Sequence, residues 1–201
     1  MFKDVLVLMI PGWGFYGASF FFDYIRRSDI SKCSYPALRQ VRAKPQTIFS
    51  MMQLNLPGYP FKIKTKEQKK YIFDAFRGKF VKLTPEEWVR QHFIRYLVEE
   101  KGYSPSLISV EMPMRYNQLD FRADAVVHDR QARPVMIIEC KAPDIQVSQE
   151  HFDQIIRYNM QLKVAYLIVT NGLEHYCCRV DAEAGRYHFL KAIPSFSELT
   201  G

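Results

Sequence analysis

The apolar run at residues 135–140, with the sequence VMIIEC, constrains the fold most, because charge enters it near its end. Glu139 lies inside the run and Lys141 follows it directly. Apolar residues on both faces are typical of a strand at the centre of a sheet. Residues two apart on a strand share a face, so the two charged side chains point the same way. A buried charge is costly unless it is paired or binds a metal. This strand end is therefore a candidate functional site, and a strand that simply emerges into solvent is the alternative.

The composition is that of an ordinary globular protein with room for one core. The chain has 201 residues, of which 48% are hydrophobic and 24% charged. A net charge of +7 permits an acidic partner such as nucleic acid. Residues 1–50 carry +4 of it and residues 51–201 only +3, so a basic surface on the larger part must be local. None of the four cysteines forms a C-x-x-C pair, which favours a reducing, cytoplasmic location over a zinc site or a disulfide framework.

The first 50 residues differ from the rest of the chain. Residues 5–25 are apolar enough to resemble a signal peptide or a membrane span, but Pro11-Gly12 and Asp23 interrupt them. We therefore expect no membrane anchor and interpret residues 1–50 as an extension without a fold of its own. Because the composition becomes regular at once after Met51 and Met52, we predict that the natural protein starts at one of them.

Hydrophobic periodicity predicts a single α/β domain over residues 52–201. A capping-box pattern at Thr84, Pro85 and Glu87 marks the start of the first helix. The order helix, three strands, helix, two strands is typical of a mixed sheet with a helical crossover. The predicted elements are a small antiparallel meander at 61–83, a helix at 84–101, strands at 107–114, 123–128 and 135–140, a helix at 148–162, and strands at 164–172 and 174–180.

Asp124 is the acid that this topology brings to Glu139. A hairpin with its loop near 129–133 places the start of one strand beside the end of the next, so two carboxylates and Lys141 converge. The backbone carbonyl of Cys140 lies between the two charged side chains. Such oxygen ligands suit Mg²⁺, for which Mn²⁺ can substitute. A lysine beside the metal can orient or deprotonate water and stabilise charge that develops on a phosphate. The constellation therefore predicts phosphodiester hydrolysis.

The segments RADAVV and VMIIECKAP resemble the PD-(D/E)XK nuclease superfamily, in which an acid precedes (D/E)-x-K on the adjacent strand. Gln154 and Tyr158 add a Q-x-x-x-Y motif, whose members share a helix face that we expect to point away from Phe152 and Ile156. With the first helix, the chain resembles the N-terminal nuclease domain of type I restriction R subunits over roughly residues 52–180. The resemblance implies a restriction-endonuclease-like mixed central sheet flanked by helices.

The resemblance also implies a Mg²⁺-dependent DNA endonuclease. Its catalytic residues would be Asp124, Glu139 and Lys141, and an acid on the first helix would join the metal site. Glu86 is preferred, since Arg90 follows four residues later and Glu87 occupies the capping-box position. The residues expected to hold the metal are Glu86, Asp124, Glu139 and the Cys140 carbonyl, and those expected near DNA are Gln154, Tyr158 and Arg157.

Several interpretations stay open on the sequence alone. Asp120 is a weaker rival to Asp124 and is interpreted as a loop residue. The lysine run at 62–70 is usually a solvated face, and the alternative is an edge that binds phosphate. No G-x-x-x-x-G-K-[ST] motor signature occurs, so we expect a nuclease-like domain without a helicase. DNA, a second copy and separate restriction-modification subunits are the expected partners. The alternative function is a non-catalytic module that binds nucleic acid or protein on a nuclease fold.

Overall fold

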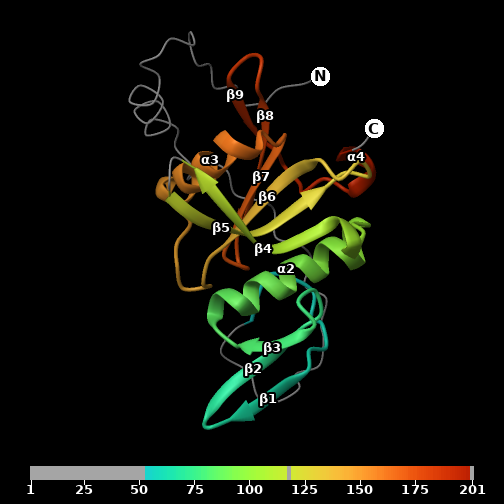
Figure 1. Cartoon of the computed structure of the whole chain (residues 1–201), viewed down its shortest axis with the longest axis vertical. Helices are drawn as coiled ribbons and strands as arrows, with labels where there is room; N and C mark the ends of the chain where they lie inside the picture. The colour runs from blue at the N-terminus through green and yellow to red at the C-terminus, as the bar shows by residue number, and fades with distance from the viewer. Residues whose placement is uncertain (1–52, 117–118, 200–201) are drawn as a thin grey trace.

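The computed structural model describes residues 53–116 and 119–199 (Figure 1). The predicted extension at 1–50, its apolar stretch and the predicted start at Met51 or Met52 lie outside the described residues. The boundary at residue 52 therefore stays a prediction. Within the described part of the chain, no helix has both the length and the apolar character needed to cross a bilayer.

The predicted meander is a separate antiparallel sheet in the order β1-β2-β3. It consists of β1 (Ile63–Lys66), β2 (Lys69–Asp74) and β3 (Lys79–Lys82). Glu67 and Gln68 form a two-residue hairpin turn with φ of 51° and 61°, the left-handed values that match the twist of the flanking strands. The turn is confined to these two residues, because Lys66 and Lys69 on either side of it already pair.

Helix α2 (Pro85–Lys101) forms as its capping pattern predicts. The Thr84 side chain accepts a hydrogen bond of 3.1 Å from the Glu87 N–H, and Gly102 ends the helix in the left-handed region. The core-facing side of the helix carries three fully buried residues spaced by four: Val89, Phe93 and Leu97. In Figure 1 the helix lies between the meander and the large sheet.

The large sheet has six strands in the order β4-β5-β6-β7-β8-β9. Strands β6 and β7 are parallel, with α3 (Gln149–Leu162) crossing between them, and the other described strand pairs are antiparallel. The strands are β4 (Ile108–Tyr116), β5 (Leu119–His128), β6 (Pro134–Cys140), β7 (Tyr166–Thr170), β8 (His175–Asp181) and β9 (Arg186–Phe189); a 3-10 turn (Pro105–Leu107) precedes β4, and α4 (Phe196–Leu199) follows β9.

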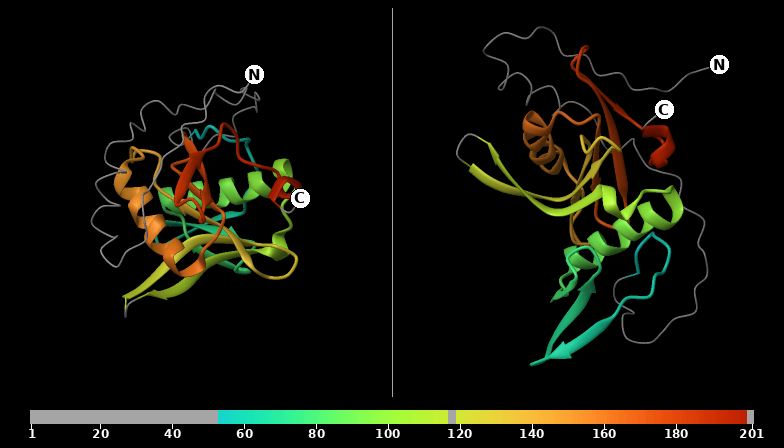
Figure 2. Two further views of the ribbon diagram at one scale, coloured as in Figure 1. Left: turned by 90° about the horizontal axis from the view of Figure 1, so that it is seen from above. Right: turned by 45° about the vertical axis from the view of Figure 1, so that its right-hand side comes forward.

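Two core clusters, one on each face of the large sheet, hold the helices in place. Helix α2 packs against Ile138, whereas α3 packs against Ile137, the next residue along the same strand. Successive residues of a strand point to opposite faces, so the two helices cover opposite sides of the sheet. Figure 2 shows this arrangement from above and from the side. The prediction of a mixed α/β sheet flanked by helices is confirmed.

Three details differ from the prediction. Asp120 was expected in a loop but lies in β5, where its backbone pairs with Arg115 across a long hairpin. Strand β9 and the short helix α4 were not predicted. Strand β9 has four residues and follows a polar turn, so its sequence alone does not predict a strand, and only its pairing with β8 identifies it.

Candidate active site

The β5–β6 hairpin brings Asp124 and Glu139 together. Ala125 pairs with Ile138, and one step further along this antiparallel register Asp124 lies opposite Glu139. The Asp124 Oδ2 atom accepts a hydrogen bond of 2.6 Å from the Cys140 N–H. The predicted convergence of the two carboxylates is therefore present, and backbone hydrogen bonding in the sheet centre fixes it.

Gln154 of α3 connects the catalytic candidates to one another. Its Nε2 atom donates to Glu139 Oε1 at 2.8 Å and contacts the Tyr158 hydroxyl at 2.5 Å. Lys141 Nζ donates to the same Glu139 oxygen at 2.8 Å and to Gln154 Oε1 at 3.2 Å. Glu139 and Lys141 thus share a face, as predicted, and the glutamine holds both of them.

The three DNA-binding candidates on α3 occupy different environments. Gln154 is half-buried, Arg157 is exposed and Tyr158 is buried. The Tyr158 ring belongs to the same core cluster as Phe152 and Ile156, so the expectation that it points away from them was wrong. A tyrosine can place its ring in a core while its hydroxyl reaches a polar partner. A helix-face rule based on spacing alone misses this.

The electrostatics of the site favour cation binding. Burial, and then the neighbouring Glu139 carboxylate, raises the pKa of Asp124 to about 7. Burial also raises the pKa of Glu139, although Lys141 opposes this. For Lys141, burial lowers the pKa, but the Glu139 carboxylate outweighs it and leaves the pKa above its usual value. Lys141 is therefore a persistent cation, while both carboxylates bind a proton more readily than a solvated carboxylate does.

The oxygen atoms present fit a divalent cation. Glu139 Oε2 is buried and has no hydrogen-bond partner among the described residues, an arrangement that costs free energy unless a cation or water satisfies it. Within the described residues, no cluster of three or more His, Cys, Asp and Glu has metal-binding geometry. Asp124 and Glu139 therefore need further oxygen ligands. Burial holds the pKa of the Cys140 thiol well above its usual value, so the sulfur stays protonated and is a poor metal ligand. The backbone carbonyl of Cys140 is therefore the predicted ligand.

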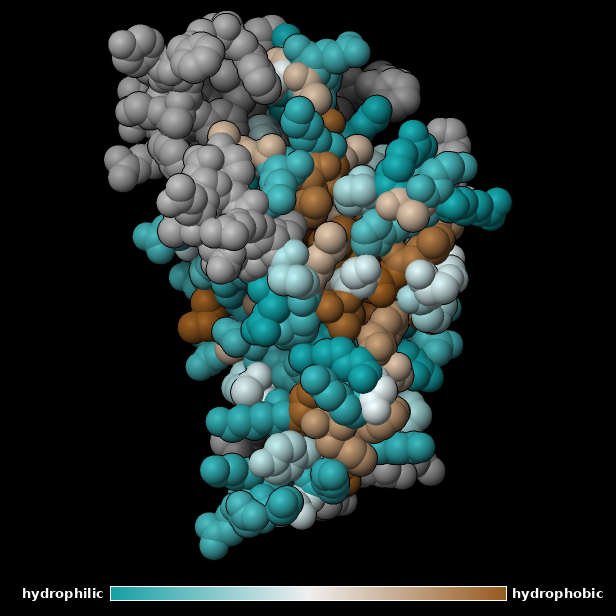
Figure 3. Space-filling model, viewed as in Figure 1, coloured by the Kyte–Doolittle hydropathy of each residue, from teal (hydrophilic) through white to brown (hydrophobic). Residues whose placement is uncertain are grey.

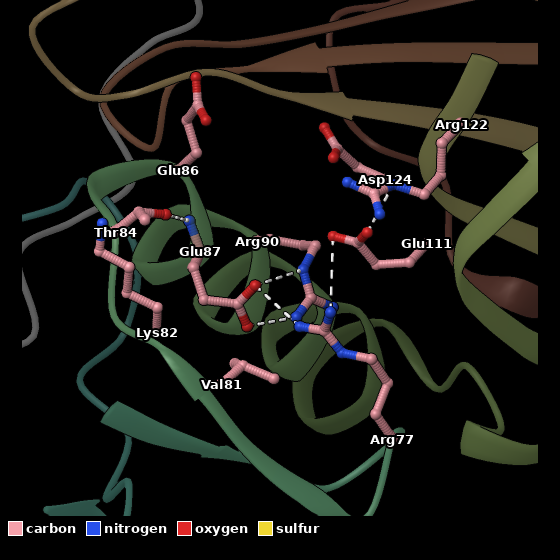
Figure 4. A pocket seen from close by; sticks show the side chains of 10 residues that line it. All are labelled: Arg77, Val81, Lys82, Thr84, Glu86, Glu87, Arg90, Glu111, Arg122 and Asp124. Atoms are coloured by element: carbon pink, nitrogen blue, oxygen red, sulfur yellow. Dashed lines mark hydrogen bonds and ion pairs between the residues drawn. The ribbon is translucent and has the colours of Figure 1, made fainter. Parts of the chain in front are cut away.

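A cavity of about 320 Å³ lies beside Asp124, between the meander, the start of α2 and strands β4 and β5. Glu86 and Glu87 both line it but differ in their surroundings (Figure 4). The buried Glu87 carboxylate accepts hydrogen bonds from Arg77, Arg90 and the Gln91 amide. Glu86 is exposed, points away from that cluster in Figure 4, and contributes to the raised pKa of Glu139. This geometry favours Glu86 as the additional acid.

A buried ion-pair network, which was not predicted, forms another wall of the cavity. Arg90 is 2% exposed and contacts Asp74, which is 1% exposed, through a bond of 2.6 Å, as well as Glu87. Arg77 joins the same two carboxylates and lies 3.6 Å from Glu111. The network ties the meander to α2. The sequence gives little indication of this network, because its acids, Asp74, Glu87 and Glu111, lie on the separate elements β2, α2 and β4.

Glu111 is a second feature that sequence reasoning missed. It has φ of 54° inside β4, between the residue pairs that flank Asp124 on β5. A non-glycine residue in this region is strained by about 1–3 kcal/mol, and such strain clusters at functional sites. Its carboxylate bonds Arg122 at 2.6 Å and contributes to the raised pKa of Asp124. No local pattern in the sequence predicts this conformation.

Residues 85–194 match the family described as the type I restriction enzyme R protein N terminus. The chain belongs to this family. The match covers α2 and all of the large sheet, and it confirms the resemblance and the fold class drawn from the sequence. Membership in the R-protein N-terminal family indicates a restriction-type function for this chain.

Solved structures also show similarity to this R-protein N-terminal family member. One of them is a fragment described as an HsdR subunit of a type I restriction enzyme from Vibrio vulnificus YJ016, with 21% sequence identity and a TM-score of 0.44. The similarity covers 59% of this chain and 25% of that chain, so the present chain corresponds to a limited part of the larger protein. Among curated proteins, no relative matches.

Proposed function

We propose that this R-protein N-terminal family member is a Mg²⁺-dependent endonuclease that hydrolyses DNA phosphodiester bonds. The observation that supports it best is the buried Glu139, which lies opposite Asp124. Lys141 and Gln154 donate to one of its oxygens, and the other has no partner among residues 53–116 and 119–199. A carboxylate pair that is destabilised at neutral pH gains most from a divalent cation. Mn²⁺ is expected to replace Mg²⁺.

Asp124, Glu139 and the Cys140 carbonyl would hold the cation, with Glu86 as the additional acid. When bound, the cation supplies Lewis-acid activation of water and of the phosphate. The sheet keeps Asp124 and Glu139 in fixed positions, so little reorganisation is needed for binding. Gln154 prevents the Glu139 carboxylate from rotating, since it bonds one oxygen and leaves the other for the ligand.

Lys141 acts as a cation rather than as a base in this proposal. Its pKa is raised, so the ammonium group persists at neutral pH and donates hydrogen bonds. Placed beside the reacting phosphate, it stabilises the negative charge that develops there. The water oxygen forms a new bond to phosphorus, one ester P–O bond breaks, and the water proton ends on the departing alkoxide oxygen.

Family membership supports the proposed substrate and partners. DNA is the expected substrate, and separate restriction-modification subunits are the expected assembly partners. A second copy of the chain would place two sites on one duplex, which is a simple route to cutting both strands. The expected location is the cytoplasm.

A nicking assay tests the catalytic proposal. The purified chain should nick supercoiled plasmid with Mg²⁺ or Mn²⁺ and not with EDTA, and Lys141→Ala should lower the rate at least a hundredfold. Lys191→Ala changes an exposed lysine outside the site and should retain full activity. Equal cleavage by Lys141→Ala would refute the assigned site. EDTA-insensitive DNA binding without cleavage under either metal would instead favour the non-catalytic binding module.

A further inference from the structure

Positive charge is concentrated on the meander. Residues 61–83 contain eight Lys or Arg and two Asp or Glu, whereas residues 84–201 contain thirteen and sixteen. The small sheet therefore carries a net +6 and the remainder of the nuclease-like region a net −3. One of the meander's two acids, Asp74, is buried in ion pairs with arginines. Its exposed surface is thus almost purely basic. Figure 3 shows hydrophilic side chains around the lower end of the molecule.

The strand register sorts the side chains of the meander onto two faces. Lys64 pairs with Tyr71 and Tyr71 with Lys82, so these three share a face. The opposite face carries the fully buried Ile72. The first face, which we call the lysine–aromatic face, consists of Lys62, Lys64, Lys66, Lys69, Tyr71, Phe73, Phe80 and Lys82.

The aromatic rings of the lysine–aromatic face are accessible. Phe80 is 36% exposed, and Tyr71 and Phe73 are half-buried. The Phe73 and Phe80 rings pack edge to face, with centroids 5.3 Å apart. Lys64 Nζ lies 3.9 Å from the Phe80 centroid. Partly exposed rings, interleaved with ammonium groups, form a surface that can bind both bases and phosphates.

We propose that the lysine–aromatic face binds single-stranded DNA. Its lysines neutralise the phosphates, and the Tyr71, Phe73 and Phe80 rings stack with unpaired bases. Duplex DNA offers phosphates to a basic surface but keeps its bases stacked on one another, so the rings would have no partner. The combination of exposed rings and lysines on one face therefore favours the single strand.

The lysine–aromatic face adjoins the candidate active site. Lys82 belongs to this face by its register and also lines the cavity that contains Asp124. A strand held on the face thus leads toward the carboxylates. The proposed binding of single-stranded DNA does not rest on the proposed nuclease function. The role of the lysine–aromatic face in holding a strand for cleavage does rest on it.

Fluorescence anisotropy with labelled oligo-dT of about 20 nucleotides, in EDTA, tests the proposal on the full chain. Phe80→Leu keeps an apolar side chain but removes the ring, and should weaken oligo-dT binding about tenfold. Lys64→Ala with Lys69→Ala should weaken binding further. The slope of the logarithm of the binding constant against the logarithm of the salt concentration should become shallower by about 0.7 per lysine removed. The matched control, Arg130→Ala with Lys191→Ala, removes two exposed charges elsewhere and should stay within about twofold of the native affinity.

Two outcomes would overturn the proposal. One is an oligo-dT affinity that neither variant changes. The other is an equal loss by Phe80→Leu for oligo-dT and for a blunt duplex of the same length, which would show a phosphate-binding surface without stacking. Lys141→Ala should bind oligo-dT normally, so a failure of the nuclease proposal and a failure of this one are separable.

Discussion

Asp124→Asn should stabilise the metal-free protein at alkaline pH, because the candidate active site buries the Asp124 carboxylate beside that of Glu139. Burial and the Glu139 carboxylate raise the pKa of Asp124 from 3.8 to about 7 in the folded state. The folded protein therefore binds an extra proton between about pH 4 and pH 7. The stability contributed by that proton is complete below pH 4 and is lost as the pH rises through 7.

The size of the effect follows from the same numbers. A pKa that rises from 3.8 to about 7 corresponds to an upper bound of about 4 kcal/mol, at about 1.4 kcal/mol per unit. Asp124 is partly exposed and shares its proton with Glu139, which reduces the expected gain to about 2 kcal/mol. Asparagine keeps the shape of the side chain and can still accept the Cys140 N–H hydrogen bond.

Urea denaturation in EDTA at pH 5 and pH 8 measures this effect as a difference between two proteins. At pH 8 the variant should be about 2 kcal/mol more stable than the native protein, the difference should be smaller at pH 5, and it should vanish only below about pH 4. The comparison cancels His92 and His175, whose pKa values burial lowers to about 4 and whose contributions to stability run in the opposite direction. Asp144→Asn, at an exposed carboxyl, should match the native protein at both pH values.

Mg²⁺ provides the complementary measurement on the same proteins. At a hundred times its Kd, Mg²⁺ should stabilise the native protein by about 2.7 kcal/mol and leave Asp124→Asn unchanged. A variant that is no more stable than the native protein at pH 8 would refute the reasoning, since burial and the Glu139 carboxylate would then not destabilise the Asp124 carboxylate in the folded state.

Three further predictions concern neighbouring residues. Glu86→Gln should keep the free energy of unfolding within about 0.5 kcal/mol of the native value but should lose the stabilisation by Mg²⁺. Glu87→Gln should lower the free energy of unfolding by about 3 kcal/mol in urea denaturation, because the buried Arg90 charge then lacks one of its partners. Gln154→Ala should slow plasmid nicking about 10–100-fold without unfolding the protein, and unchanged kinetics would contradict its positioning role. Gly172→Ala should lower stability by about 1–3 kcal/mol in the same denaturation assay, because φ is +83° and the added Cβ would lie 2.7 Å from a methyl group of Leu54.

Much of the fold was predictable because its signals are local. The capping box of α2 lies within four residues, and the apolar run of β6 is continuous. The E-x-K spacing fixes which face Glu139 and Lys141 share, and a short hairpin suffices to bring Asp124 to them. Each of these inferences needs only neighbouring residues or one turn of known geometry.

The remainder depends on contacts between distant segments. Arg90 is buried because Asp74 and Glu87 reach it from different elements, and neither acid is distinctive in the sequence. The buried ring of Tyr158 reflects how α3 sits on the sheet, which periodicity does not determine. The left-handed conformation of Glu111 likewise depends on its surroundings in the sheet rather than on a local signal.

The central claim is that Asp124 and Glu139 hold a divalent cation, and anomalous diffraction from crystals soaked in Mn²⁺ tests it most directly. We expect one strong Mn²⁺ peak about 2.2 Å from a carboxylate oxygen of each residue, with Glu139 Oε2 and the Cys140 carbonyl among the ligands. The Asp124→Asn protein should lose that peak. A well-ordered native crystal with no Mn²⁺ between these two carboxylates at millimolar concentration would contradict the account.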